Sequence, residues 1–249
     1  MNSRFKVGDY VTRKKYNNDI VFKIKSINKD LIILSGVDVR LYADAYINDL
    51  VLTSISKKKE EVSTLRSLDV DKYFYIPGRV LHIDADKNYL EKCKEYYETQ
   101  KVKYYGYIFK EKDFKDKVND LIQKHKPEIV VITGHDAYYK NDKYKNSKYF
   151  IDTVKQIRDK YSNVIIIAGA CQSDYEGLIK AGSTFASSPS HINIHALDPA
   201  IIATYIALTS KDKTIDLIEM LSKTKYGSEG IGGFVINGTM RIGYPRKKE

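Results

Sequence analysis

The sequence predicts an α/β protein with a mainly parallel sheet sandwiched between helices. A small β domain is predicted at the N-terminal side of the α/β domain. Two runs of the chain carry the α/β prediction. Residues 128–133 and 163–168 are almost continuously apolar and β-branched, which is typical of strands buried on both faces of a parallel sheet. Between them, apolar side chains recur at helical spacing from Tyr149 to Tyr161. A right-handed crossover then makes the two strands parallel neighbours, with both carboxyl ends at one edge.

The first 55 residues are predicted to form the small β domain. Short strand candidates are separated by turn-forming residues; they span residues 5–11, 20–27, 31–34 and 37–41. The short strands and the opening Val7-Gly8-Asp9 favour an SH3-like barrel. Residues 56–72 are charged and lack sheet periodicity, so they are predicted to be a linker. Residues 73–249 are predicted to be the α/β domain.

Strand-like and helix-like segments alternate from Arg79 onward, as in an α/β domain. Further strands are expected at residues 79–84, 102–109 and 183–186, and further helices at 86–99, around 114–122, after Cys171 as far as 181, at 198–208 and at 214–223. Asp198-Pro199 has the pattern of an N-cap followed by the first helical position. In the tail, Asn237-Gly238 lies between two apolar runs, which predicts a β-hairpin.

Composition limits the classes of function. The chain has 249 residues, 43% of them hydrophobic, and no stretch near the roughly 20 apolar residues that span a bilayer. Its amino terminus lacks the apolar region of a signal peptide, so we expect a cytoplasmic protein without a membrane partner. The formal charge of +10 comes from lysines interleaved with acids along the chain, and nucleic acid is therefore not the expected partner.

The two cysteines differ in their surroundings. Cys93 shares a predicted helical face with tyrosines and leucine, as a core residue would. Cys171 follows one of the two apolar runs, and His135 follows the other, 36 positions earlier. An imidazole next to a thiol favours the thiolate, which is the nucleophile, and nearby main-chain N–H groups can stabilise an oxyanion. The alternative is a buried cysteine in a strand-to-helix turn with a surface histidine nearby.

The remaining histidines favour structural roles. His82 alternates with Asp84 on one strand face, and His125 ends a helix, where a cation is favourable. His191 and His195, with Asp198 as the one accompanying carboxylate, make a thin ligand set for zinc. We expect neither a metal nor another cofactor.

The order strand, histidine, helix, strand, cysteine, with Ala170-Cys171-Gln172 at the nucleophile, resembles the caspase-like cysteine peptidases that include gingipains, legumain and clostripain. This chain departs from their pattern at two positions. Asp136 follows His135 where those peptidases have glycine, and Ser173 stands where a caspase has glycine. The resemblance implies an oxyanion site formed by the main-chain N–H groups of Asp136 and Cys171.

The chain resembles the YabG family of sporulation-specific peptidases more closely, in blocks that extend over essentially its whole length. The blocks are residues 5–9, 77–82, 131–138, 168–173, 185–190 and 193–199. This resemblance implies an endopeptidase in the mother cell, associated with the forming spore coat. It also implies protein substrates among spore-coat and germination proteins, cleavage after arginine, and catalysis by His135 and Cys171.

A pocket for arginine requires a carboxylate, which binds a guanidinium through two hydrogen bonds. Asp84, Asp86 and Asp198 are predicted near the edge that carries Cys171. Asp86 and Asp198 also suit helix caps, so Asp84 is the leading candidate and Asp198 the second. If cleavage follows arginine, Arg66, the one arginine in the predicted linker, is a candidate self-cleavage site.

Two other functions stay open at this point. One is a cysteine-dependent amidase or hydrolase of small molecules, which would use the same pair of residues. The other is a non-catalytic morphogenetic protein of the spore coat, whose two domains only bind partners. The oligomeric state also stays open.

Overall fold

A computed structural model describes residues 5–55, 73–139 and 143–244 of the chain. The chain divides into two compact units, with the boundary between residues 61 and 62. The predicted linker, residues 56–72, and Arg66 within it lie outside the described residues. The domain boundaries predicted at residues 55 and 73 therefore stay a prediction.

The first unit is a five-stranded antiparallel sheet in the order β4-β3-β2-β1-β5. Its strands are β1 (Tyr10–Arg13), β2 (Phe22–Asn28), β3 (Leu31–Gly36), β4 (Tyr42–Tyr46) and β5 (Leu50–Leu52), with single-turn 3-10 helices η1 (Lys14–Tyr16) and η2 (Ile47–Asp49). Apolar side chains that alternate along the strands form its core, as period-two patterning requires. The prediction of a strand at 37–41 is wrong, because the fourth strand begins at Tyr42, and β5 was not predicted. The SH3-like barrel stays a prediction.

The second unit is α/β with a mostly parallel sheet, as predicted. Its six-stranded sheet has the order β14-β13-β12-β9-β7-β8. The strands are β7 (Val80–Asp84), β8 (Tyr104–Ile108), β9 (Ile129–Thr133), β12 (Ile165–Ala168), β13 (Phe185–Ser187) and β14 (Ile231–Gly233). All neighbouring pairs are parallel except β13 with β14. The two apolar runs become β9 and β12, which are direct neighbours.

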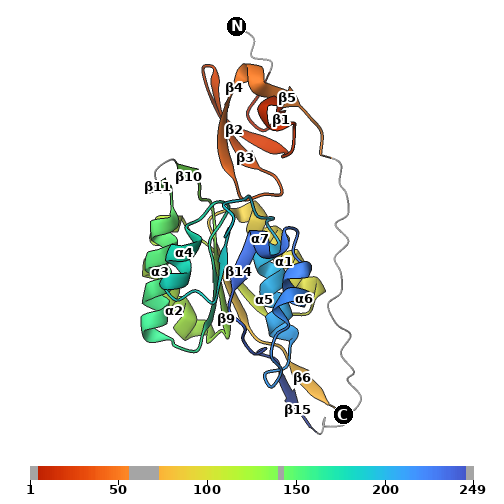
Figure 1. The fold of residues 1–249 in the computed structure, drawn as a ribbon, viewed down its shortest axis with the longest axis vertical. Helices are drawn as coiled ribbons and strands as arrows, with labels where there is room; N and C mark the ends of the chain where they lie inside the picture. Colours follow the sequence, from red (N-terminus) through yellow and green to blue (C-terminus); the bar gives the residue numbers. More distant parts are fainter. Residues whose placement is uncertain (1–4, 56–72, 140–142, 245–249) are drawn as a thin grey trace. The chain divides into compact units, whose positions relative to one another are not determined.

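Helices cover both faces of this sheet (Figure 1). One face carries α2 (Phe114–His125), α3 (Ser147–Lys160) and α4 (Tyr175–Lys180); the other carries α1 (Lys87–Thr99), α5 (Asp198–Leu208), α6 (Leu217–Ser222) and α7 (Gly227–Gly230). The 3-10 helix η3 (Glu111–Asp113) precedes α2. Helix α4 ends at Lys180, and Gly182 follows its C-cap residue with a φ of 107°, a conformation that glycine adopts readily.

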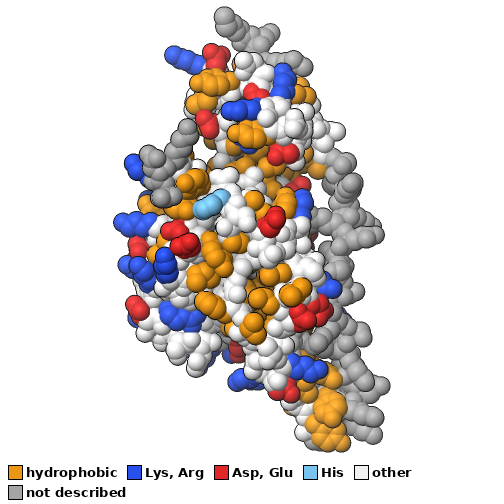
Figure 2. Space-filling view, in the orientation of Figure 1, with side chains coloured by type: hydrophobic (Ala, Val, Ile, Leu, Met, Phe, Trp, Pro, Cys, Tyr) orange, Lys and Arg blue, Asp and Glu red, His pale blue; other side chains and the backbone are white. Residues whose placement is uncertain are grey.

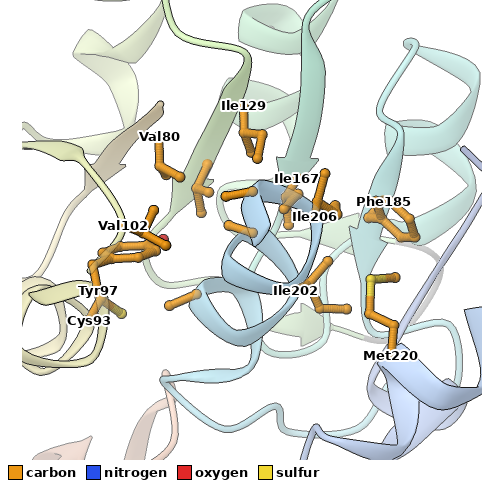
Figure 3. Packing of buried hydrophobic residues seen from close by; sticks show 14 of the residues in the cluster. Val80, Cys93, Tyr97, Val102, Ile129, Ile167, Phe185, Ile202, Ile206 and Met220 are labelled. Carbon is orange, nitrogen blue, oxygen red and sulfur yellow. The ribbon is translucent and has the colours of Figure 1, made fainter. Parts of the chain in front are cut away.

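Each face of the sheet has its own hydrophobic core. On the face shown in Figure 3, strand residues such as Val80, Ile129 and Ile167 pack against Ile202 and Ile206 of α5. Cys93 belongs to this cluster and is fully buried, so its predicted role as a core residue is confirmed. The strands alternate between the two cores, because successive side chains point to opposite faces.

The prediction of a hairpin around Asn237-Gly238 is wrong. Strand β14 pairs with β13, whereas β15 (Arg241–Gly243) pairs with β6 (Phe74–Ile76). The Asn-Gly segment instead packs against the end of α5: a side chain at Gly238 would come within 2.1 Å of the carbonyl oxygen of Thr209. Tertiary contacts thus override the local turn preference. The β6–β15 ribbon exposes apolar side chains at its tip (Figure 2).

A short ribbon of β10 (Tyr138–Tyr139) and β11 (Lys143–Tyr144) follows β9 at the other end of this unit from β6–β15 (Figure 1).

Among the described residues, no helix is both long and apolar enough to cross a membrane.

Candidate active site

His135 lies two positions past the end of β9, after Gly134. Glycine is required at this point because of a close approach. A Cβ on Gly134 would lie 3.0 Å from Oε1 of Glu111 and 3.1 Å from Cβ of Ala85. The strand therefore leaves the sheet in close contact with η3, and His135 follows at a fixed place.

The His135 side chain is 3% exposed and lies between two carboxylates. Its main-chain N–H donates to Oε1 of Glu111 at 3.0 Å, and the same oxygen lies 3.7 Å from its Nδ1. On the other side, Oδ2 of Asp86 is 3.6 Å from Nε2. The ring centroid of Tyr89 is 5.7 Å away. One carboxylate thus faces each ring nitrogen of His135.

Electrostatics at Glu111 agree with this arrangement. Burial alone would raise the pKa of Glu111, but the nearby His135 ring and the hydrogen bond from the His135 main chain outweigh it, and the pKa lies below its ordinary value. Glu111 is therefore ionised at neutral pH. Asp86 has a second task, because its Oδ1 accepts from the N–H groups of Asn88 and Tyr89 and caps α1, as predicted.

Cys171 lies in the loop that follows β12. Gly169, just after the strand, has a φ of 111°, and a Cβ there would meet Leu178 at 3.0 Å. Helix α4 begins only at Tyr175, four positions after Cys171. The thiol is thus beyond the reach of the helix dipole, which is felt over the terminal turn. Helix α4 therefore does not stabilise a thiolate at Cys171 through its dipole.

The main chain of Ile194 supplies the polar partners of the thiol. The Ile194 N–H donates to Sγ at 3.3 Å, and Sγ lies 3.6 Å from the Ile194 carbonyl oxygen. Cys171 is completely buried. The Ile194 N–H is placed to stabilise negative charge on sulfur, and its carbonyl oxygen accepts a hydrogen bond from the thiol.

The sheet brings the two loops together. In the β9–β12 ladder, Ile132 is opposite Ala168, and the Gly169 N–H donates to the Ile132 carbonyl at 3.1 Å. His135 and Cys171 each lie three positions beyond this paired level. Both residues therefore start from the carboxyl edge of adjacent parallel strands, where ligands of open α/β sheets bind.

Asp136 connects the loop that carries His135 to the loop that carries Cys171 through hydrogen bonds. Its Oδ2 accepts from the hydroxyl of Ser173, two residues after Cys171, at 3.0 Å, and also from the hydroxyl of Ser147. Its Oδ1 accepts from the N–H groups of Ala137 and Asn146 at 2.9 and 2.8 Å. Ser173 in turn accepts from the Ala170 N–H. Burial raises the pKa of Asp136, and these hydrogen bonds oppose that rise.

Known peptidases match this chain over nearly its whole length. The family model described as YabG peptidase U57 matches residues 6–69 and 54–245. The sporulation-specific protease YabG of Bacillus subtilis (strain 168) is 38% identical over 287 aligned positions, which cover 98% of this chain and 99% of that protein.

The chain belongs to the YabG peptidase family. Membership makes it a peptidase, and the matches cover both structural units. The sequence resemblance to this family is thereby confirmed.

Asp84 is the first carboxylate predicted to bind arginine in this YabG-family chain. Its side chain is completely buried. Its Oδ1 accepts from the Asp86 N–H at 2.9 Å and its Oδ2 from the Thr133 hydroxyl at 2.8 Å. His82 lies in the same network and contacts Tyr97 and Thr133, which confirms its structural role. Asp84 is thus held beneath the edge by internal donors, and its role in a substrate pocket stays a prediction.

Asp198, the second candidate, is also buried. It accepts from the main-chain N–H groups of His195 and Lys225 at 3.1 and 3.0 Å. Burial raises its pKa, while these donors and the charges of His195 and Lys225 oppose the rise. Asp198 begins α5 rather than preceding it as an N-cap, so that helix starts one position earlier than predicted. Its role in substrate binding also stays a prediction.

The other histidines of this YabG-family chain have aromatic or main-chain neighbours. His191 lies against the rings of Tyr138 and Tyr144, and Nδ1 of His195 faces the Leu197 N–H at 3.3 Å. Within residues 5–55, 73–139 and 143–244, no group of three potential ligand side chains is arranged to hold a metal ion.

Sequence reasoning missed Glu111, which contacts both the main chain and the ring of His135. A signal was present: Glu111 follows the parallel strand β8 by three positions, at the same sheet edge as His135. Among the interleaved charges of Lys110-Glu111-Lys112-Asp113, nothing local distinguishes Glu111 from its neighbours.

Proposed function

We propose that this YabG-family peptidase is a cysteine endopeptidase in which Cys171 is the nucleophile and His135 the general base. The observation that carries the proposal is the position of both residues beyond the same level of two adjacent parallel strands. The two carboxylates around His135 support it, because the imidazole must become positively charged during the reaction.

In the proposed reaction, His135 takes the Cys171 proton and the sulfur attacks the scissile carbonyl carbon. The resulting oxyanion is stabilised by the main-chain N–H groups of Asp136 and Cys171. His135 then protonates the leaving amine as the C–N bond breaks, which leaves an acyl-enzyme. Water, deprotonated by His135, hydrolyses the thioester and regenerates the thiol.

Access to the thiol requires a local change. Cys171 is fully buried and contacts the main chain of Ile194. A substrate carbonyl can therefore reach Sγ only after the residues that cover the thiol move. Binding of the substrate chain would drive that movement, as lids and loops do in many enzymes.

The proposed substrates are spore-coat and germination proteins, cleaved after arginine, in the mother cell. The name of the Bacillus subtilis relative, a sporulation-specific protease, supports the sporulation role. Asp84 and Asp198 are the proposed carboxylates for the guanidinium. Both carboxylates accept hydrogen bonds from internal donors in this structure. To bind a substrate guanidinium, either carboxylate would have to give up these hydrogen bonds.

Inhibitor sensitivity tests the catalytic class. Iodoacetamide is expected to inactivate peptide cleavage with modification of Cys171, and chelators such as EDTA to leave cleavage unchanged, because the proposed reaction uses a thiolate and no metal. Cleavage of a mixed peptide library, followed by mass spectrometry of products and of the labelled cysteine, measures both. Loss of activity with EDTA and full activity after alkylation of Cys171 would instead indicate a metal-dependent hydrolase.

Self-cleavage tests the arginine preference. Active protein is expected to yield a product that begins at Ser67, after Arg66, whereas Cys171→Ala is expected to remain intact. The matched control is Arg66→Lys in an otherwise active chain, which should abolish this cut because lysine cannot form the two-pronged guanidinium contact. N-terminal sequencing of purified protein measures the outcome. An intact chain under conditions in which peptides are cleaved contradicts this prediction.

A further inference from the structure

Glu111 makes two contacts with the proposed base. Its Oε1 accepts the His135 main-chain N–H at 3.0 Å and lies 3.7 Å from the ring Nδ1. Glu111 reaches this place from η3, and Gly134 leaves room for its side chain. Glu111 thus contacts both the main chain and the ring of His135.

The charged and titratable groups that face His135 come from three elements. Asp86, before α1, faces Nε2; Glu111, in η3, faces Nδ1; and Tyr89, in α1, packs against the ring. Asp86 is already engaged in capping α1 through its other oxygen. Glu111, in contrast, accepts its hydrogen bond from His135 itself.

We propose that Glu111 is a positioning residue that orients the His135 ring through Nδ1 and stabilises the imidazolium formed when Cys171 loses its proton. This inference rests on the proposed Cys171–His135 mechanism. It completes a cysteine–histidine–glutamate arrangement in which Nδ1 faces Glu111, and it assigns the proton exchange with nucleophile and substrate to Nε2, which lies 3.6 Å from Oδ2 of Asp86 in this structure.

The proton balance of this step is simple. The proton moves from Sγ of Cys171 to Nε2 of His135 as the S–C bond forms, and from Nε2 to the leaving nitrogen as the C–N bond breaks. Glu111 stays ionised throughout and takes no proton. Its effect is electrostatic and geometric, as for the carboxylate of a hydrolase triad.

The test uses three variants of the full chain. Glu111→Gln keeps an oxygen that can accept the His135 N–H but removes the charge; Glu111→Ala removes both; and Glu111→Asp keeps the charge on a shorter side chain. Asp116→Asn is the matched control, because Asp116 is an exposed acid in the first turn of α2. Its loss changes the net charge equally without touching the site.

Glu111→Gln is expected to lower kcat about 10- to 100-fold, with KM changed less than about twofold. An opposite charge within about 4–6 Å changes proton affinity by roughly one to three decades. Since the leaving amine needs the imidazolium, the alkaline limb of the kcat profile should move to lower pH by about one unit. Glu111→Asp should restore that limb, and Asp116→Asn should match the unmodified protein.

Two outcomes separate this inference from the proposed function. If Cys171→Ala or His135→Ala cleaves normally, the proposed function fails. If both are inactive while Glu111→Gln and Glu111→Ala keep the unmodified kcat and pH profile, the positioning role of Glu111 is overturned alone. A lower kcat of Glu111→Gln with an unchanged pH profile and a lowered thermal midpoint also overturns it, because that pattern indicates only a structural role.

Discussion

Cys171→Ala is expected to lose peptide cleavage below detection, a fall of about 10⁴-fold or more, because the proposed acyl-enzyme forms on the Cys171 sulfur. His135→Ala should lose about 10³- to 10⁴-fold, since the thiol then has no base and the leaving amine no acid. The double variant should be hardly slower than Cys171→Ala, because nucleophile and base act as a unit. Initial rates on the best library peptide measure all three.

Cys93→Ser is the matched control for the thiol. Cys93 is fully buried in the core between the sheet and α5 (Figure 3), and its Sγ donates to the Ala196 carbonyl at 3.5 Å. A serine hydroxyl can keep that contact, so activity should stay near that of the unmodified protein. An inactive Cys93→Ser variant that is folded, beside an active Cys171→Ala variant, would show that the other cysteine is the nucleophile.

Asp136→Ala is expected to lower the free energy of unfolding of the α/β unit by about 3 kcal/mol or more. It leaves two main-chain N–H groups and two hydroxyls without their acceptor, at about 1–3 kcal/mol for each buried group that stays unsatisfied. The thermal midpoint should fall by roughly 6–12 °C. Asp159→Ala, at an exposed position on α3, should change it by less than about 2 °C. Calorimetry or thermal circular dichroism measures both.

Asp136→Asn should be much milder than Asp136→Ala at neutral pH. The amide oxygen keeps the two main-chain donors, and the amide NH₂ can donate to the hydroxyls of Ser147 and Ser173. Since burial raises the pKa of Asp136, the folded state of the unmodified protein takes up a proton as pH falls from neutral through the raised value toward 3.8, and this uptake adds stability.

Asp136→Asn lacks this proton uptake, so its stability relative to the unmodified protein should decline as pH is lowered through that window. Denaturant unfolding of the two proteins at several pH values, compared at each pH, measures the difference. A constant difference at every pH, or an Asp136→Asn variant as unstable as Asp136→Ala, contradicts the assigned network.

The pattern of apolar residues predicted much of the fold because burial determines it. A strand buried on both faces has to be apolar along its whole length, and the runs that became β9 and β12 satisfy this requirement. Helix α1 and its Asp86 cap could likewise be predicted, since capping depends on neighbours within one turn. The tail could not: Asn237-Gly238 suits a hairpin, but β13 and β6 compete for its flanking strands.

The sequence by itself therefore determined the α/β class, the neighbouring strands β9 and β12, and the position of His135 and Cys171 after them, because these follow from local periodicity and chain connectivity. Only the tertiary structure decided what surrounds the two residues. Glu111 accepts a hydrogen bond from His135, Asp136 accepts one from Ser173, and Ile194 donates one to Cys171, across separations of 23 to 37 positions. Such contacts depend on how distant loops pack over one sheet edge, which no short pattern encodes. For the same reason Asp84, placed by sequence at the rim, proved to be buried beneath it.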